Sequence, residues 1–157
     1  FPAGRLDKTS TGFVLLTDDG GFAHEILAPK RHVSKTYTVV IDTPLTEEMC
    51  RGFAEGVTLA DGTALSPAEV EAMTPDGLTV KVRLRQGVYH QIKRMFGVYG
   101  AGVNALHREA IGGLALDAQL APGQWRELSD EEMAKITIQN TALFTRLSKM
   151  YHNLPVK

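Results

Sequence analysis

The sequence predicts one α+β domain, because segments typical of strands and of helices alternate along its 157 residues. A chain of this length can bury roughly 70% of its unfolded surface in a single core. Hydrophobic residues make up 43% of the chain and charged residues 22%, which is ordinary for a globular protein. No internal repeat and no low-complexity linker divides it.

Strands are predicted where β-branched and aromatic residues cluster or where apolar and polar residues alternate. They are expected over residues 12–17, 35–42, 77–87, 105–116 and 124–128. In the third of these, apolar side chains occupy one face, and Lys81, Arg83 and Arg85 occupy the other. The "TDDGG" stretch after the first strand is predicted to form a tight hairpin turn and not a calcium loop, because the later calcium ligands are missing.

Helices are predicted over residues 21–29, 46–56, 89–100 and 129–136. The first should end at Pro29, and the second has Thr46 as a candidate N-cap and Gly56 at its end. Residues 137–157 are expected to form a C-terminal helical extension, docked on the domain or on a partner. Its apolar stripe consists of Leu143, Phe144, Leu147, Met150 and Tyr151.

Charge is nearly balanced overall but is unevenly distributed. The formal net charge is −1, yet residues 81–94 hold five bases and no acid, and Lys30, Arg31 and Lys35 form a second acid-free cluster. Such clusters indicate either a basic face for a phosphate backbone or separate solvated patches. The single cysteine, Cys50, rules out an internal disulfide and fits a reducing cytoplasm. The apolar runs are too short to span a bilayer, so we expect no membrane association.

The stretch "GRLDKTSTG" at residues 4–12 poses the main functional question. Asp7 lies between an apolar residue and a polar turn, and two interpretations stay open. It is either a turn-capping aspartate or a catalytic carboxylate held at the mouth of a cleft.

Five segments together resemble the pseudouridine synthases that modify ribosomal RNA. These are "GRLDKTSTGFVLLTDDG", "KTY" at residues 35–37, "GVYHQIKRMF" at 87–96, "LHREAIGGLAL" at 106–116 and "PGQWREL" at 122–128. The form "YHQIKRMF" is similar to the branch that acts on small-subunit rRNA. The resemblance implies a mixed, mostly antiparallel sheet flanked by helices, with the RNA cleft across the sheet. Residues 1–136 would then form the catalytic domain, and further strands and a small RNA-binding domain would be expected upstream.

Carried over residue by residue, the resemblance implies that Asp7 is the catalytic aspartate and that Tyr37 stacks on the target base. Lys93 would pair with the Asp7 carboxylate and favour its ionised form, with Arg94 as the rival for this role. Tyr37 could instead be an ordinary core tyrosine. The remaining residues expected to bind substrate, as pocket wall or RNA contact, are Arg5, Arg83, Arg85, His90, Arg94, Leu106 and Arg108. Val88 departs from the basic residue usual in this branch, so one phosphate contact is expected to be lost.

The function expected from this resemblance is isomerisation of a uridine in small-subunit rRNA. The expected substrate is an assembly intermediate of the small subunit, and the expected enzyme is a cytoplasmic monomer. Breaking and remaking the glycosidic bond requires no metal or cofactor, and no CxxC, HExxH or phosphate-loop motif signals one. The carboxylate could attack the sugar, attack the base or remove the C2′ proton. The alternatives are a catalytically silent RNA-binding or ribosome-assembly factor on the same fold, and a synthase for large-subunit rRNA.

Overall fold

The computed structural model describes residues 1–28, 33–88, 90–136 and 149–154. Within these residues the strands form one eight-stranded sheet in the order β3-β4-β2-β5-β1-β8-β7, with β6 paired to β5. Strands β1 and β5 run parallel, whereas the other strand pairs are antiparallel. The prediction of a mixed, mostly antiparallel sheet is therefore confirmed.

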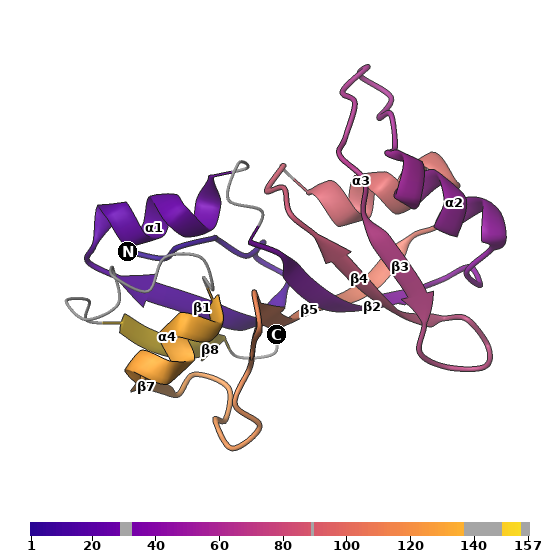
Figure 1. Cartoon of the computed structure of the whole chain (residues 1–157). Helices are drawn as coiled ribbons and strands as arrows, with labels where there is room; N and C mark the ends of the chain where they lie inside the picture. The colour runs from indigo at the N-terminus through magenta and orange to yellow at the C-terminus, as the bar shows by residue number, and fades with distance from the viewer. Residues whose placement is uncertain (29–32, 89, 137–148, 155–157) are drawn as a thin grey trace.

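The elements follow the predicted alternation closely. The strands are β1 (Thr11–Thr17), β2 (Lys35–Ile41), β3 (Glu69–Ala72), β4 (Thr79–Leu84), β5 (Val103–Ile111), β6 (Leu114–Ala115), β7 (Trp125–Glu127) and β8 (Lys149–Leu154). The helices are α1 (Gly20–Leu27), α2 (Glu47–Glu55), α3 (Gln91–Val98) and α4 (Asp130–Ile136). Figure 1 shows two halves, one with α1, α4, β1, β7 and β8 and the other with α2, α3, β3 and β4, which β2 and β5 connect.

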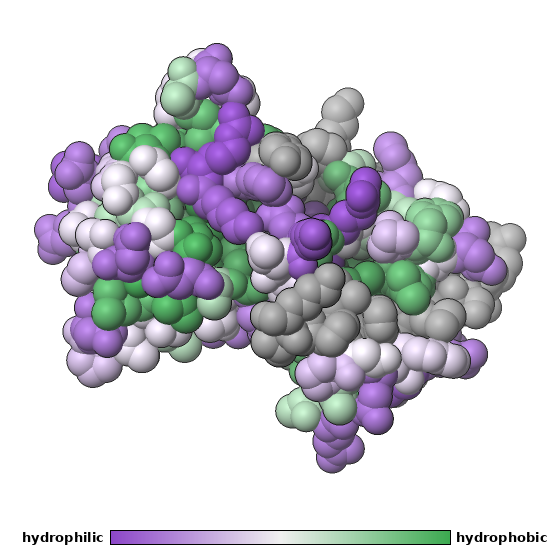
Figure 2. All heavy atoms as spheres, turned by 180° about the vertical axis from the view of Figure 1, so that it is seen from behind, coloured by the Kyte–Doolittle hydropathy of each residue, from purple (hydrophilic) through white to green (hydrophobic). Residues whose placement is uncertain are grey.

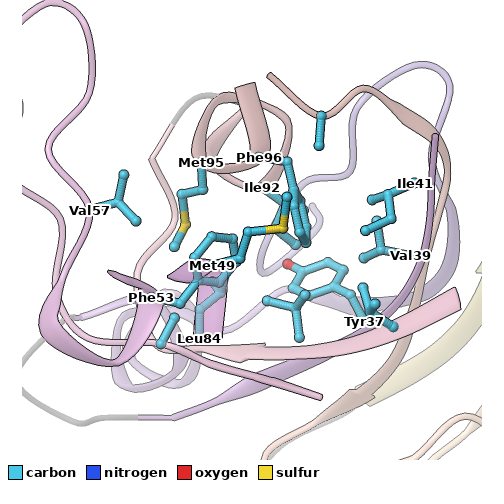
Figure 3. Packing of buried hydrophobic residues seen from close by; sticks show 14 of the residues in the cluster. Tyr37, Val39, Ile41, Met49, Phe53, Val57, Leu84, Ile92, Met95 and Phe96 are labelled. Atoms are coloured by element: carbon cyan, nitrogen blue, oxygen red, sulfur yellow. The ribbon is translucent and has the colours of Figure 1, made fainter. Parts of the chain in front are cut away.

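Two hydrophobic clusters correspond to these halves. One packs α2 and α3 against the inner face of β2 and β4 and includes Tyr37, Val82 and Phe96, whereas the other packs α1 and α4 around Phe13 of β1. Figure 3 shows the first cluster, in which Phe96 and Tyr37 point into the same apolar interior. The expected single core is therefore divided in two, and the segment that carries Asp7 lies just before β1.

Local capping explains where two of the helices begin. Thr46 accepts a hydrogen bond from the Met49 backbone N–H at 3.2 Å, as predicted for the N-cap of α2. Asp19 accepts one from Phe22 N–H at 2.9 Å and caps α1. The expected hairpin turn at "TDDGG" was therefore wrong, because this aspartate starts a helix. The tight turn lies instead at Gly112 and Gly113, between β5 and β6.

The expected C-terminal helix is wrong for the two stripe residues that the structure describes. Met150 and Tyr151 lie in strand β8, which pairs along β1 and with β7. The other three residues of the predicted stripe, Leu143, Phe144 and Leu147, lie outside the described residues, and so do Lys30 and Arg31. Strand β3 was not predicted, because its sequence "EVEA" has only one strong strand former.

Candidate active site

The Asp7 loop is tied to the sheet on both sides. The Ser10 N–H donates to the Asp7 carbonyl at 3.0 Å, which closes a turn just before β1. Upstream, Arg108 of β5 donates from Nη2 to the Gly4 carbonyl at 2.7 Å and from Nε to the Phe13 carbonyl at 2.8 Å. The buried guanidinium of Arg108 therefore joins β5 to β1 and to the segment that precedes Asp7.

Gly12 allows β1 to approach β5 at the level of this guanidinium. Its φ is +112°, and a Cβ at this position would lie 2.2 Å from the backbone oxygen of Arg108. Only glycine fits such a conformation and such a contact. The glycine that ends the "KTSTG" motif is thus required by the packing of the strand that follows Asp7.

Two basic side chains from the start of α3 face the Asp7 carboxylate. Lys93 Nζ lies 3.9 Å from Oδ2 of Asp7, and His90 Nε2 lies 3.4 Å from Oδ1. Lys93 also donates to the Thr9 hydroxyl at 3.0 Å, so the turn itself holds the lysine in place. The side chain of Asp7 is 29% exposed, which leaves the carboxylate within reach of a ligand.

The geometry separates Lys93 from its neighbour Arg94. Arg94 Nη2 contacts Asp61 Oδ2 at 2.7 Å, on the other side of α3. Hydrogen bonds from Thr63 and then from Arg94 lower the pKa of Asp61 to about 2. Arg94 therefore supports a surface loop, and Lys93 is the cation at Asp7.

His90 is the one non-glycine residue with a positive φ in the described chain, at 48°. It immediately precedes α3 and makes no side-chain capping bond to the helix. This left-handed conformation is uncommon for residues other than glycine, although histidine is among those that adopt it more often. Its cost is of the kind found where a side chain must be aimed at a functional group, here the Asp7 carboxylate.

Tyr37 and Leu106 lie on the apolar side of the same region. They are 8% and 9% exposed, and both belong to the cluster against which Leu6, the neighbour of Asp7, also packs. Tyr37 pairs with Arg108 in register, and Val39 pairs with Leu106. An apolar floor therefore lies beside a carboxylate with two basic neighbours.

The other predicted RNA-contacting cations fall in different places. Arg108 is 1% exposed and bound to backbone carbonyls, so its position is that of a structural support and not of a surface contact. Arg83 pairs with Glu69 at 3.2 Å, on the face of β4 opposite α3. Arg5 and Arg85 are exposed. Seen from behind, hydrophilic and hydrophobic residues are interspersed on this face of the molecule (Figure 2).

Sequence reasoning missed two residues of this site. Thr9 was not singled out, although it lies two residues after Asp7 in the turn. Lys35 was named in a charge cluster and in the "KTY" segment but was given no role of its own, although it lies two residues before Tyr37 on β2. A pocket of about 500 Å³ lined by residues such as His107, Glu109 and Asp117 does not include Asp7 or Lys93.

The described residues contain no helix long and apolar enough to cross a membrane. They also contain no group of three or more His, Cys, Asp or Glu side chains arranged to hold a metal ion.

The fold and this arrangement agree with comparisons to known proteins. The family model described as RNA pseudouridylate synthase matches residues 1–97, and the chain belongs to this family. A crystal structure of a pseudouridylate synthase superposes with a TM-score of 0.81 at 42% identity, covering 86% of this chain and 58% of the other.

Two curated relatives are similar to most of this chain, and one of them is named for the small ribosomal subunit. The chain is 47% identical over 135 residues to ribosomal small subunit pseudouridine synthase A of Escherichia coli K12, covering 85% of this chain and 58% of the relative. It is 42% identical over 135 residues to an uncharacterized RNA pseudouridine synthase of Bacillus subtilis, covering 85% and 56%. The chain thus spans little more than half the length of these relatives.

Proposed function

We propose that this protein isomerises a uridine to pseudouridine in small-subunit ribosomal RNA, with Asp7 as the catalytic carboxylate. The observation that carries the proposal is the contact of Asp7 with Lys93 and His90 in a chain of this family. The name of the Escherichia coli relative supports the small ribosomal subunit as the source of the substrate.

The reaction breaks the bond between N1 of the base and C1′ of the ribose, turns the base, and forms a bond from C5 to C1′. The proton lost from C5 is balanced by the proton gained at N1, so no redox partner is needed. An ionised carboxylate can act as nucleophile or base at this centre. Lys93 places a positive charge 3.9 Å from this carboxylate, and a hydrogen bond to Thr9 holds the lysine in place.

The target uridine must leave its stack to reach Asp7, because the reacting atoms of a base inside a helix are inaccessible. Tyr37 supplies an aromatic ring on the apolar floor, and stacking of a base on such a ring contributes about 1–3 kcal/mol. Leu106 extends this floor along β5. In this proposal the base meets the apolar side chains of Tyr37 and Leu106, and its ribose meets the Asp7 carboxylate.

The test is to incubate the protein with small-subunit RNA and, separately, with large-subunit RNA, each bare and partly assembled, and to map new pseudouridine. The proposal predicts modification of one small-subunit position. Modification confined to large-subunit RNA would move the substrate to the other branch. RNA binding without any pseudouridine would favour a silent assembly factor on the same fold.

A further inference from the structure

Lys35 is a buried lysine that the proposed reaction has not yet used. It begins β2 and is only 4% exposed. Among the residues that the structure describes, no carboxylate forms an ion pair with it. A lysine is seldom fully buried unless it is paired, so this position calls for a physical explanation.

The register of the sheet places Lys35 on the same face as Tyr37. Lys35 pairs with Leu84 of β4, and Tyr37 pairs with Val82, and both β4 partners belong to the apolar cluster on the α3 side. Residues two apart on a strand are separated by about 6.6 Å and point to the same side. On the other side of β2, Tyr37 pairs with Arg108.

The electrostatics of this position are unfavourable in the unliganded protein. Burial, and secondarily the positive charge of Arg108, lower the pKa of Lys35 from 10.5 to about 8. The residues paired with Lys35 in the sheet, Leu84 and Ile111, are apolar and offer no compensation. A methionine would fill the space without this cost, so the ammonium group is expected to serve a ligand.

We propose that Lys35 binds the phosphate group of the target nucleotide while the base of that nucleotide lies against Tyr37. The inference rests on the proposed function for the identity of the ligand as a uridine nucleotide. The ribose separates base from phosphate by a span comparable to the spacing of Lys35 and Tyr37 on the strand. Arg108 adds a positive charge close enough to act on Lys35, and its hydrogen bonds to the Phe13 and Gly4 carbonyls hold its guanidinium in place.

The experiment compares binding of UMP and uridine by calorimetry at pH 8. We expect the unmodified protein to bind UMP more tightly than uridine, because the phosphate meets a buried cation. Lys35→Met should weaken UMP binding by about tenfold and leave uridine binding unchanged, whereas Lys35→Arg should retain the preference for UMP. Lys81→Met is the matched control, since Lys81 pairs with Glu109 on the opposite face of β4.

Proton uptake on UMP binding, measured first with the unmodified protein, gives a second readout. With a pKa of about 8, Lys35 is half protonated at pH 8, so UMP binding should take up about half a proton. The phosphate itself contributes little, because its second pKa is near 6. Uptake should be absent in Lys35→Arg and unchanged in Lys81→Met.

The proposed phosphate site is contradicted if the unmodified protein shows no preference for UMP over uridine. It is equally contradicted if Lys35→Met keeps that preference. The proposed function stands or falls separately, because pseudouridine formation by the unmodified protein is measured without reference to UMP. If UMP binding depends on Lys35 but the protein forms no pseudouridine, the phosphate site is supported and the proposed reaction is contradicted.

Discussion

Lys93 Nζ lies 3.9 Å from the Asp7 carboxylate and 3.0 Å from the hydroxyl of Thr9, so one ammonium group spans the turn that carries the proposed catalytic residue. Arg94, the next residue on α3, contacts Asp61 instead. Successive residues on a helix point about 100° apart, and this rotation separates the two cations. Their different partners allow a controlled test of the site.

Lys93→Met should reduce the rate of pseudouridine formation by at least tenfold, because the Asp7 carboxylate loses the ammonium group beside it. Arg94→Met is the matched control and should retain most of the activity, since Arg94 contacts a surface loop. The measurement is the single-turnover rate with saturating RNA, together with RNA affinity. A larger loss of rate in Arg94→Met than in Lys93→Met would mean that the roles are reversed.

Tyr37→Leu should lower the rate more than it lowers RNA affinity, because Tyr37 meets one base whereas many cations meet phosphates. Tyr37→Phe keeps the ring and should retain most of the rate. Both variants need a measured free energy of unfolding, since Tyr37 is also part of the core. A large loss of affinity at an unchanged rate would identify Tyr37 as a docking or structural residue.

Arg108→Met should lower the free energy of unfolding by about 3 kcal/mol or more, because two hydrogen bonds from a buried charged donor are lost. Arg85→Met, at an exposed position just past β4, should change stability by less than about 0.5 kcal/mol. Urea unfolding of both variants checks this. Equal stabilities would show that Arg108 does not hold the Asp7 loop to the sheet.

The lowered pKa of Lys35 should be visible in the pH dependence of the free energy of unfolding. Its pKa is about 8 in the folded protein and near 10.5 when unfolded, so between these values the unfolded chain binds more protons and stability rises with pH. The destabilisation caused by burying the charged form of Lys35 is fully present below pH 8 and amounts to about 3 kcal/mol. Relative to Lys35→Met, the unmodified protein should therefore gain stability between pH 7.5 and 10. A stability difference that stays constant over this range would contradict the burial of a charged ammonium.

The sequence predicted most elements because their local signals agree with the tertiary structure. Thr46 is an N-cap by residue type and by geometry, and the alternation in β4 matches the buried and exposed faces of the strand. Local signals failed where pairing between distant segments decides the structure. Met150 has helical spacing to its apolar neighbours, yet it pairs with Leu16 of β1 in a strand.

The candidate site was predictable in part for a similar reason. The motifs mark Asp7, Tyr37 and Lys93 as residue types, but the choice between Lys93 and Arg94 depends on the rotation of α3 against the Asp7 turn. The sequence alone does not distinguish Arg108 from the basic residues at the surface. Only the packing of β1 on β5 shows that its guanidinium is buried and bound to carbonyls.

The most direct test of the account is the activity of Asp7→Asn. Asparagine keeps the shape of the side chain and its ability to form hydrogen bonds, but it cannot act as a carboxylate nucleophile or base. The account predicts that Asp7→Asn binds small-subunit RNA nearly as tightly as the unmodified protein and forms no detectable pseudouridine. A rate of pseudouridine formation within about tenfold of the unmodified protein, which is about 1.4 kcal/mol in activation free energy, would contradict the central claim.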